Sequence, residues 1–336
     1  MLLFNKNTDT EIVVIAEIGV NHMGSFDWII NMLPQVKAAG ADAIKFQLFT
    51  PDLYSSRSNV ERYKQISKLV LSKSDFLQIQ KLGKSLDLPV FATPLSHDWV
   101  QFIADNCGVI KIASGDFTFD PTVDAALKTS AQIIISSGAT TRDEVEAFIK
   151  KARIIRPGDR YRDTLALLHC ISSYPPSLSE SNLSAIPDLV QLTGLTVGFS
   201  SHFLEDSPLY AAIGLGARVF EIHVTDDRDR KDIRDHALSR TPKELKNIID
   251  TLRELNRSCL SGRKTIQPSE MNSLNNLRKG VVFSKNLSRG HKVTSSDLEF
   301  ARPLDPTVPN KELLLGKILK EDVLSYTSVS LDKFDL

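Results

Sequence analysis

Short apolar segments alternate with amphipathic stretches of helical length through the first two-thirds of the chain. Each apolar segment ends in polar or charged residues, and the stretch after it repeats its apolar residues at helical spacing. Eight β-strands are predicted here, at Ile12–Glu17, Ala43–Gln47, Val90–Thr93, Val109–Ser114, Ile133–Ser137, Leu165–Cys170, Thr196–Ser200 and Val219–His223. Strands that alternate with helices in this number are typical of a (β/α)8 TIM barrel, whose active site gathers at the carboxyl ends of the parallel strands.

Local signals mark where the intervening helices begin. Thr141 to Glu144 forms a capping box that opens a helix through Ile149. Thr241 to Glu244 forms another, in which Pro242 occupies the first helical turn, where its missing N–H costs nothing. The helix that follows, predicted from Leu245 to about Asn256, completes the barrel.

The last part of the chain differs from the first in its composition and periodicity. From Ser258 to about Ser273 the periodicity fades and Ser, Gly, Pro and Asn become frequent, as in a linker. Short β-like runs follow at Gly280–Ser284, Lys292–Thr294 and Leu298–Ala301. We therefore expect a barrel domain over 1–257, a linker over 258–274, and a small β-rich domain over 275–336.

Composition narrows the class of protein. The 336 residues include 42% hydrophobic and 24% charged residues, which is ordinary for a globular protein. Lys plus Arg and Asp plus Glu both number 41, so no overall field attracts the chain to nucleic acid or to a membrane. Neither is expected as a partner, and any anion binding must come from locally placed groups.

Cysteine usage and the N-terminal residues predict the compartment. Cys107, Cys170 and Cys259 are few, odd in number and far apart, so a disulfide framework is not expected. The segment from Met1 to Thr10 lacks the apolar core of a signal peptide, and no later stretch is long enough to span a bilayer. A cytoplasmic location is expected.

Two histidines follow neighbouring strands. His202 lies just past the seventh predicted strand and His223 ends the eighth, so both imidazoles are expected to reach one divalent metal, with water and substrate as further ligands. The alternative is a hydrogen-bonded pair of core histidines. Glu221 shares a strand face with His223, and Glu17 is adjacent once the barrel closes, where a carboxylate can orient a hydroxyl or accept a proton from water.

Two lysines interrupt apolar strands. An unpaired ammonium at an inward position is costly, so Lys45 and Lys111 together predict a small anionic ligand, either a carboxylate or a phosphate. Thr93, Ser114 and Ser136 add hydroxyl groups suited to phosphate oxygens. A Schiff-base lysine is the competing interpretation, because burial lowers the pKa of a lysine.

Several phrases together resemble the sialic acid synthase family. They are Ala16–His22 (AEIGVNH), Ile44–Gln47 (IKFQ), Phe91–Pro94 (FATP), Lys111–Asp116 (KIASGD), Leu168–Cys170 (LHC) with Tyr174-Pro175, Ser200–His202 (SSH) and Asp235–Ser239 (DHALS). The resemblance is ordered along nearly the whole chain. It extends to the C-terminal part, which is similar to the antifreeze-like (SAF) domain of those synthases.

The resemblance implies a reaction and a set of roles. The family joins phosphoenolpyruvate to an N-acylated hexosamine, typically N-acetylmannosamine, and forms a nine-carbon 3-deoxy-2-keto sugar acid and phosphate. It implies Mn²⁺ or Mg²⁺ held by His202 and His223, and Glu17 and Asp235 beside the metal-bound water and the sugar aldehyde. Glu221 is a further candidate catalytic carboxylate because it shares a strand face with His223. Phosphoenolpyruvate or the sugar would be bound by Lys45, Gln47, Thr93, Lys111, Ser114, Asp116, Ser136, Ser172, Tyr174 and Ser200. Arg302 matches the arginine that the C-terminal domain inserts into the partner subunit's active site, so a domain-swapped homodimer is implied.

Some positions depart from the family pattern. Ser172 stands where the family usually has Asn, Ser201 replaces an Asp, and Asp116 replaces a Glu. The turn from Arg302 to Pro306 lacks the usual glycine. These changes leave the acceptor sugar open: N-acetylmannosamine, its 6-phosphate or a diacetamido sugar. Two other functions remain, a non-catalytic paralogue that binds a sugar acid, and a metal-dependent aldolase that cleaves one.

Overall fold

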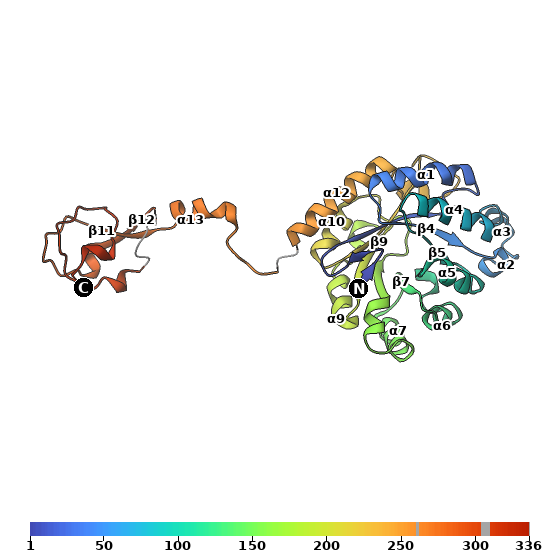
Figure 1. Ribbon diagram of the computed structural model, residues 1–336, viewed down its shortest axis with the longest axis horizontal. Coiled ribbons are helices and arrows are strands. Elements are labelled where there is room, and N and C mark those ends of the chain that lie inside the picture. Colours follow the sequence, from blue (N-terminus) through green and yellow to red (C-terminus); the bar gives the residue numbers. More distant parts are fainter. Residues whose placement is uncertain (260–261, 304–309, 336) are drawn as a thin grey trace. The chain divides into compact units, whose positions relative to one another are not determined.

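The computed structural model describes residues 1–259, 262–303 and 310–335. The chain divides into two compact units, Met1–Leu260 and Ser261–Leu336. The first unit contains a closed barrel of eight parallel strands in the order β10-β3-β4-β5-β6-β7-β8-β9. Helices surround this barrel on its outside (Figure 1). The TIM barrel predicted from the sequence is therefore confirmed.

The barrel strands alternate with helices in chain order. The strands are β3 (Val13–Gly19), β4 (Ala43–Leu48), β5 (Val90–Pro94), β6 (Val109–Ile112), β7 (Gln132–Ser136), β8 (Leu165–Cys170), β9 (Thr196–Ser201) and β10 (Val219–His223). The α-helices of this unit are α1 (Phe26–Ala39), α2 (Pro51–Tyr54), α3 (Val60–Ser67), α4 (Lys73–Ser85), α5 (Val100–Cys107), α6 (Asp120–Lys128), α7 (Arg142–Ile155), α8 (Asp159–Thr164), α9 (Ala185–Thr193), α10 (Ser207–Gly214), α11 (Asp235–Leu238) and α12 (Pro242–Cys259). A short hairpin of β1 (Leu2–Leu3) and β2 (Lys6–Asn7) precedes the barrel.

All eight predicted strands are present, but β6 ends two residues and β7 one residue earlier than predicted. β6 stops at Ile112, and Ser114–Asp116 forms a single 3₁₀ turn. The Asp116 N–H donates to the Ala113 carbonyl at 3.0 Å, which turns the chain out of the sheet. Ser114 therefore sits at the barrel mouth in a turn and not in a strand.

Both predicted capping boxes are present. The Thr141 N–H donates to Glu144 Oε2 at 2.7 Å, and the Thr241 N–H donates to Glu244 Oε2 at 2.8 Å. Both helices are longer than predicted, since α7 continues to Ile155 and α12 to Cys259. In the extension of α7 Ala152 is buried against the barrel, whereas residues 257–259 of α12 are exposed.

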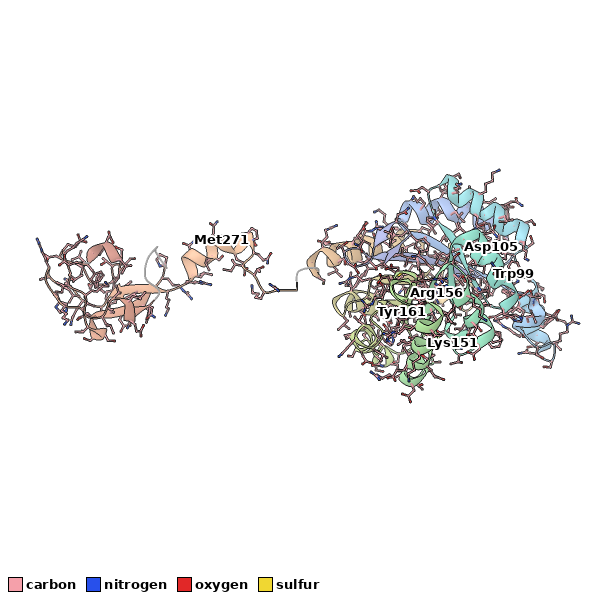
Figure 2. The ribbon with its side chains drawn as sticks, turned by 60° about the horizontal axis from the view of Figure 1, so that its bottom comes forward. Trp99, Asp105, Lys151, Arg156, Tyr161 and Met271 are labelled. Atoms are coloured by element: carbon pink, nitrogen blue, oxygen red, sulfur yellow. The ribbon has the colours of Figure 1, made fainter. Side chains whose placement is uncertain are left out.

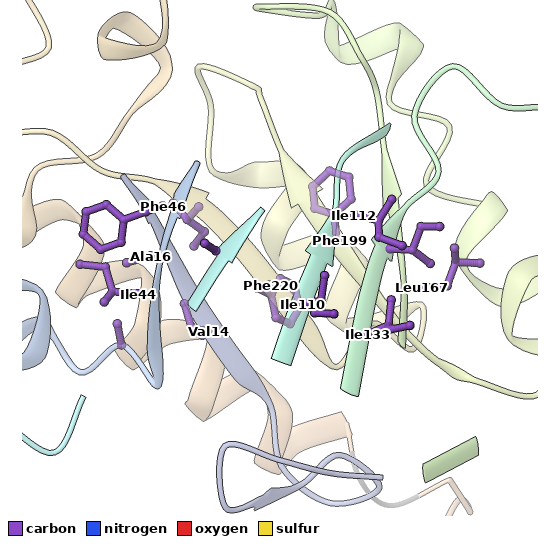
Figure 3. Packing of buried hydrophobic residues seen from close by; sticks show 14 of the residues in the cluster. Val14, Ala16, Ile44, Phe46, Ile110, Ile112, Ile133, Leu167, Phe199 and Phe220 are labelled. Carbon is purple, nitrogen blue, oxygen red and sulfur yellow. The ribbon is translucent and has the colours of Figure 1, made fainter. Parts of the chain in front are cut away.

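The barrel has two separate apolar layers, because successive side chains of a strand point to opposite faces. Side chains such as Val14, Ile44 and Phe46 point outward and pack beneath the helices (Figure 3). Side chains such as Val13 and Ile15 point inward and fill the lower barrel. The outer layer holds the helices in place, and the inner layer supports the functional groups above it.

A buried arginine joins two of the outer helices to the barrel. Arg156, labelled in Figure 2, is fully buried and follows α7. Its guanidinium donates to the carbonyls of Ala126, Leu127, Thr129 and Ala131, at 2.8 to 3.0 Å. These carbonyls end α6 and lead into β7, so the arginine caps a helix end from inside the protein.

The C-terminal unit has a core of its own. β11 (Gly280–Phe283) and β12 (Leu298–Ala301) pair in antiparallel fashion, and residues between Val281 and Phe334 form a separate buried cluster. The β-like run predicted at Lys292–Thr294 does not form a strand, and Lys292 makes one isolated bridge with Ile318. The segment predicted as a linker also contains a helix, α13 (Met271–Leu277). Among the described residues, no helix is both long and apolar enough to cross a membrane.

Candidate active site

The inward-facing positions of the barrel change from apolar to ionisable toward the carboxyl ends of the strands. On β3 the inward series is Val13, Ile15 and then Glu17. On β10 it is Val219 and then Glu221. Both glutamates are buried, with exposed fractions of 1% and 4%. An apolar floor therefore supports a layer of charged groups inside the barrel.

Lys45 and Glu17 face each other from adjacent strands. The two residues are paired in register, and Lys45 Nζ lies 2.5 Å from Glu17 Oε2. Lys45 also donates to Thr93 Oγ1 at 2.9 Å. Gln47 Nε2 donates to the other carboxylate oxygen of Glu17 at 3.1 Å. Four of the predicted site residues thus belong to one hydrogen-bonded group.

Lys111 and Glu221 form the second half of the cluster. Lys111 Nζ donates to Ser136 Oγ at 2.7 Å and to the Ile112 carbonyl at 3.0 Å. Glu221 Oε2 lies 3.9 Å from Lys111 Nζ and 3.8 Å from Lys45 Nζ. Ser200 Oγ donates to Glu221 Oε1 at 3.0 Å. Two lysines and two glutamates are therefore held together in the buried interior of the barrel.

The environment shifts the pKa values of the two buried glutamates in opposite directions. Burial raises the pKa of Glu17 toward neutrality, against the attraction of Lys45. Burial acts in the same sense on Glu221, but the attraction of Lys111 and Lys45 outweighs it and lowers the pKa of that carboxyl. Burial also lowers the pKa of Lys111. Two carboxyls whose pKa values separate in this way are suited to different roles, one exchanging a proton and one staying charged.

The two predicted histidines meet at the mouth. The imidazole rings of His202 and His223 lie 5.2 Å apart in an edge-to-face arrangement. His202 Nδ1 lies 2.9 Å from the Ile171 carbonyl, so Nε2 is the ring nitrogen that could coordinate a metal. His223 Nε2 lies 4.0 Å from Asp235 Oδ2, and its buried Nδ1 has no hydrogen-bond partner. The structure therefore brings His202, His223 and Asp235 together at the mouth.

The donor set fits a divalent cation only in part. Burial lowers the pKa of His223 to about 4, so this imidazole is neutral, the form that coordinates metals. Burial also acts to lower the pKa of His202, but contact with Cys170 outweighs it and raises that pKa. Since a metal binds only the neutral imidazole, the raised pKa of His202 opposes metal binding there. Within the described ranges, no three His, Cys, Asp or Glu side chains are grouped closely enough to enclose a metal, so further ligands must come from water or substrate.

A stack of three planar groups forms one wall of the mouth. The Tyr174 ring centroid lies 4.0 Å from that of His202, and the Arg234 guanidinium lies 4.3 Å from the Tyr174 ring centroid. Arg234 Nε is also 3.5 Å from Asp235 Oδ1. The stack limits how Tyr174 and Asp235 can move and brings both to the same side of the mouth.

A cavity of about 1130 Å³ opens above the charged cluster. Gln47, Asp116, Tyr174 and Asp235 line it, all four predicted from the sequence. Its wall includes side chains that were not predicted, from the segments after β4 and β10: Tyr54, Arg62, Gln65, Lys231, Asp232 and Arg234. The usable signal was the unusual length of those two strand-to-helix segments, because the loops at this face build the sites of TIM barrels.

The remaining predicted residues are placed less centrally. Ser114 Oγ accepts from the Gly138 N–H at 3.0 Å. Asp116 is half-buried at the cavity wall, and burial raises the pKa of its carboxyl. Ser172 is exposed, and its hydroxyl lies so close to Gly138 that a Cβ there would come within 2.3 Å. Arg302 is exposed in the C-terminal unit, and the turn after it, Leu304–Pro306, lies outside the described residues.

Fold and site together define a TIM-barrel enzyme whose buried, charge-balanced cluster lies beneath a large polar cavity. Residues 32–264 match the NeuB family, and residues 278–334 match the SAF domain. The chain belongs to the NeuB family. The resemblance to sialic acid synthases and the C-terminal SAF domain are thereby confirmed, and the chain is an enzyme of that type.

Individual relatives cover most of the chain. An uncharacterized protein of Methanocaldococcus jannaschii is 34% identical over 86% of this chain and 84% of its own length. The N,N'-diacetyllegionaminic acid synthase of Legionella pneumophila is 30% identical over 89% and 87%. The crystal structure of N-acetylneuraminic acid synthetase from Leptospira borgpetersenii, in complex with citrate, superposes with a TM-score of 0.74 at 27% identity and covers 79% of this chain and 91% of that chain.

Proposed function

We propose that this enzyme joins phosphoenolpyruvate to the aldehyde of an open-chain N-acylated hexosamine and releases phosphate. The product would be a nine-carbon 3-deoxy-2-keto sugar acid. The observation that supports this most strongly is the pair of buried lysines, since Lys45 and Lys111 lie among hydroxyl groups and share Glu221 as a counter-ion. An anion that enters the cavity would compete with Glu221 for both ammonium groups.

The proposed reaction forms a C–C bond and breaks a C–O bond. C3 of phosphoenolpyruvate attacks the aldehyde carbon, water adds to C2, and the C2–O bond to phosphate breaks. The added water loses both of its protons as C2 becomes a ketone: one goes to the former aldehyde oxygen and the other to the departing phosphate, so no net proton is consumed. Glu17 is the group best suited to exchange these protons, because its raised pKa lies closer to neutrality than that of an exposed carboxyl.

The other residues bind and orient. Lys45, Lys111 and the hydroxyls of Thr93, Ser136 and Ser200 would hold the phosphate and carboxylate while charge moves from the enol to the leaving phosphate. Asp235, at the cavity wall beside Tyr174, would receive the acceptor sugar. His202 and His223 would hold Mn²⁺ or Mg²⁺, which when bound polarises the aldehyde as a Lewis acid.

The proposal specifies the acceptor sugar only by its class, an N-acylated hexosamine. The cavity of about 1130 Å³ accommodates a hexosamine beside phosphoenolpyruvate. A panel of N-acetylmannosamine, its 6-phosphate and a 2,4-diacetamido hexosamine, each with and without Mn²⁺, would identify it by phosphate release. Phosphate released only when one sugar is present supports the proposal. Cleavage of a 3-deoxy-2-keto sugar acid to pyruvate, without any phosphate release from phosphoenolpyruvate, would instead establish the aldolase.

We also propose a domain-swapped homodimer in the cytoplasm. The domain boundaries proposed from the sequence, at residues 257 and 274, would allow the SAF domain to act on a second subunit's barrel. Arg302 is the residue proposed to act there, and its exposure within its own unit is compatible with such a role. A mixed-dimer experiment described below tests this arrangement.

A further inference from the structure

Asn21 lies buried where the chain leaves β3, and its amide joins two other segments. Its side chain has no exposed surface. Nδ2 donates to the Val224 carbonyl at 2.9 Å and to Ser239 Oγ at 3.0 Å. Val224 directly follows His223, and Ser239 directly follows α11. One amide group therefore connects the ends of β3 and β10 with the short helix that begins at Asp235.

The second link leads from Ser239 to Asp235. Ser239 is also fully buried, and its hydroxyl donates to the Asp235 carbonyl at 2.6 Å. Since the hydroxyl accepts from Asn21 while it donates to Asp235, two consecutive hydrogen bonds run from the end of β3 to the backbone of Asp235. Asp235 in turn directs its carboxylate toward His223, at 4.0 Å from Nε2.

The helix that carries Asp235 needs such support. α11 has four residues, a single turn, which is too short to be stable without external contacts. Arg240 anchors the far end: Nη1 donates to the Leu238 carbonyl at 2.7 Å, and Nη2 donates to the Leu204 carbonyl at 2.8 Å. These bonds tie α11 to the segment after β9. Asn21 supplies the matching connection to β3, the strand of Glu17.

We propose that Asn21 is a positioning residue that sets the place of Asp235 relative to His223 and Glu17. This rests on the proposed function, in which Asp235 receives the acceptor sugar. Asn21 itself lies beneath the mouth, fully buried, and acts through Val224 and Ser239. It makes no hydrogen bond to the lysine cluster that would hold phosphoenolpyruvate.

The most informative variant is Asn21→Asp, because it keeps the size of the side chain and removes the Nδ2 donor. A carboxylate oxygen then faces the Val224 carbonyl and cannot donate to it. The Ser239 hydroxyl can bond to that carboxylate only by turning its proton away from the Asp235 carbonyl, so the connection to Asp235 is broken. We expect kcat to fall by about tenfold or more and KM for the sugar to rise, since a misplacement of about 1 Å is enough for such losses. Affinity for phosphoenolpyruvate, measured by calorimetry without sugar, should stay within about twofold of the wild type, because Lys45 and Lys111 keep their contacts.

Asn256→Asp is the matched control. Asn256 is buried to a similar degree, at 6% exposed, and its Nδ2 donates to the Thr10 carbonyl at 2.9 Å. Like Asn21, it leaves a buried Oδ1 without a partner. Thr10 precedes β3, so this bond lies at the opposite end of the barrel. Asn256→Asp should lower stability as Asn21→Asp does, and should leave kcat and both substrate affinities unchanged.

Hydrogen exchange provides a readout that does not depend on turnover. Asn21→Asp should accelerate amide exchange across residues 224–239, whereas Asn256→Asp should not. Ser239→Ala removes both hydrogen bonds of the hydroxyl but keeps the bond from Asn21 to the Val224 carbonyl, and it serves if Asn21→Asp fails to fold. It should show the same pattern, weaker, with Ser239→Thr restoring part of the activity. Unchanged exchange at 224–239 in the Asn21 or Ser239 variants, or kinetics equal to those of Asn256→Asp, would overturn the proposal. A wild-type enzyme that releases no phosphate with any sugar would overturn the proposed function instead, and exchange would still decide whether Asn21 holds α11.

Discussion

Replacing Lys111 by Met is the perturbation that most directly probes the buried charge cluster. Methionine retains much of the apolar stem but removes the ammonium. Lys111 Nζ is the group that donates to Ser136 at 2.7 Å and lies 3.9 Å from Glu221. Without it, Glu221 keeps Lys45 at 3.8 Å and the Ser200 hydroxyl as its stabilising contacts. The cluster changes from two positive and two negative groups to one positive and two negative groups.

The magnitude follows from the type of bond that is lost. A hydrogen bond to a charged group contributes about 1.5 to 3 kcal/mol, so phosphoenolpyruvate should bind roughly 10- to 150-fold more weakly. The surplus negative charge of the variant weakens binding further. This additional loss is limited, because Glu221 takes up a proton more easily once Lys111 is gone. Its low pKa depends on Lys111 and Lys45, which overcome the effect of burial.

Calorimetric titration of phosphoenolpyruvate in the absence of sugar measures this loss without turnover. Lys151→Met is the matched control, because Lys151 pairs with Asp124 at 2.9 Å on the outside of the barrel. It removes the same charge and should leave the affinity unchanged. Lys111→Met with an affinity within about twofold of the wild type would refute the anion site. Borohydride trapping of a substrate on Lys111 in the wild type would favour the Schiff-base interpretation.

Three further predictions address the metal, the pH dependence and the assembly. His202→Ala or His223→Ala should abolish turnover without unfolding the chain, and calorimetric titration with Mn²⁺ should show lost binding; unchanged affinity in both variants would remove the metal assignment. Burial lowers the pKa of His22 from 6.5 to about 4, so the unfolded state binds more protons in that window and stability is lost as the pH falls through it. His22→Asn should reduce the difference in unfolding free energy between pH 7 and pH 5 by roughly 2 kcal/mol, as measured by urea denaturation, and an unchanged difference would contradict this. Arg302→Ala chains mixed with Lys111→Met chains should regain part of the activity, whereas no recovery despite proven heterodimers would exclude the domain swap.

The part of the site that lies on strands could be predicted from the sequence. A strand alternates its side chains with a period of two, so a charged residue that continues an inward apolar series must lie in the barrel interior. Lys45, Lys111, Glu221 and His223 satisfy this condition, and the structure brings all four to one place. The barrel itself follows from the same periodicity.

The part that lies on loops could not be predicted in the same way. Arg62 and Lys231 reach the cavity because the segments after β4 and β10 fold back over the mouth, and no local pattern specifies that path. Phe49, Ile66 and Ile233 form a small apolar cluster that joins those two segments. The early end of β6 was missed because the turn at Ser114 has no stronger local signal than the preceding apolar run.

Asn21 shows a further limit. Its motif, AEIGVNH, carries part of the family resemblance, but its hydrogen bonds are to Val224 and Ser239, about two hundred positions later in the chain. Buried amides of this kind are satisfied by tertiary partners, which only the folded chain identifies.

The most direct test of the proposed reaction follows the oxygen atom that bridges C2 and phosphorus in phosphoenolpyruvate. The enzyme is incubated with bridge-¹⁸O-labelled phosphoenolpyruvate, Mn²⁺ and the sugar that supports phosphate release, and both products are analysed by mass spectrometry. We predict ¹⁸O in the released phosphate and none in a product whose mass equals that of the sugar plus pyruvate, because the C2–O bond breaks. Label retained in the keto acid, or phosphate released without any product that contains the sugar, would contradict the proposed condensation.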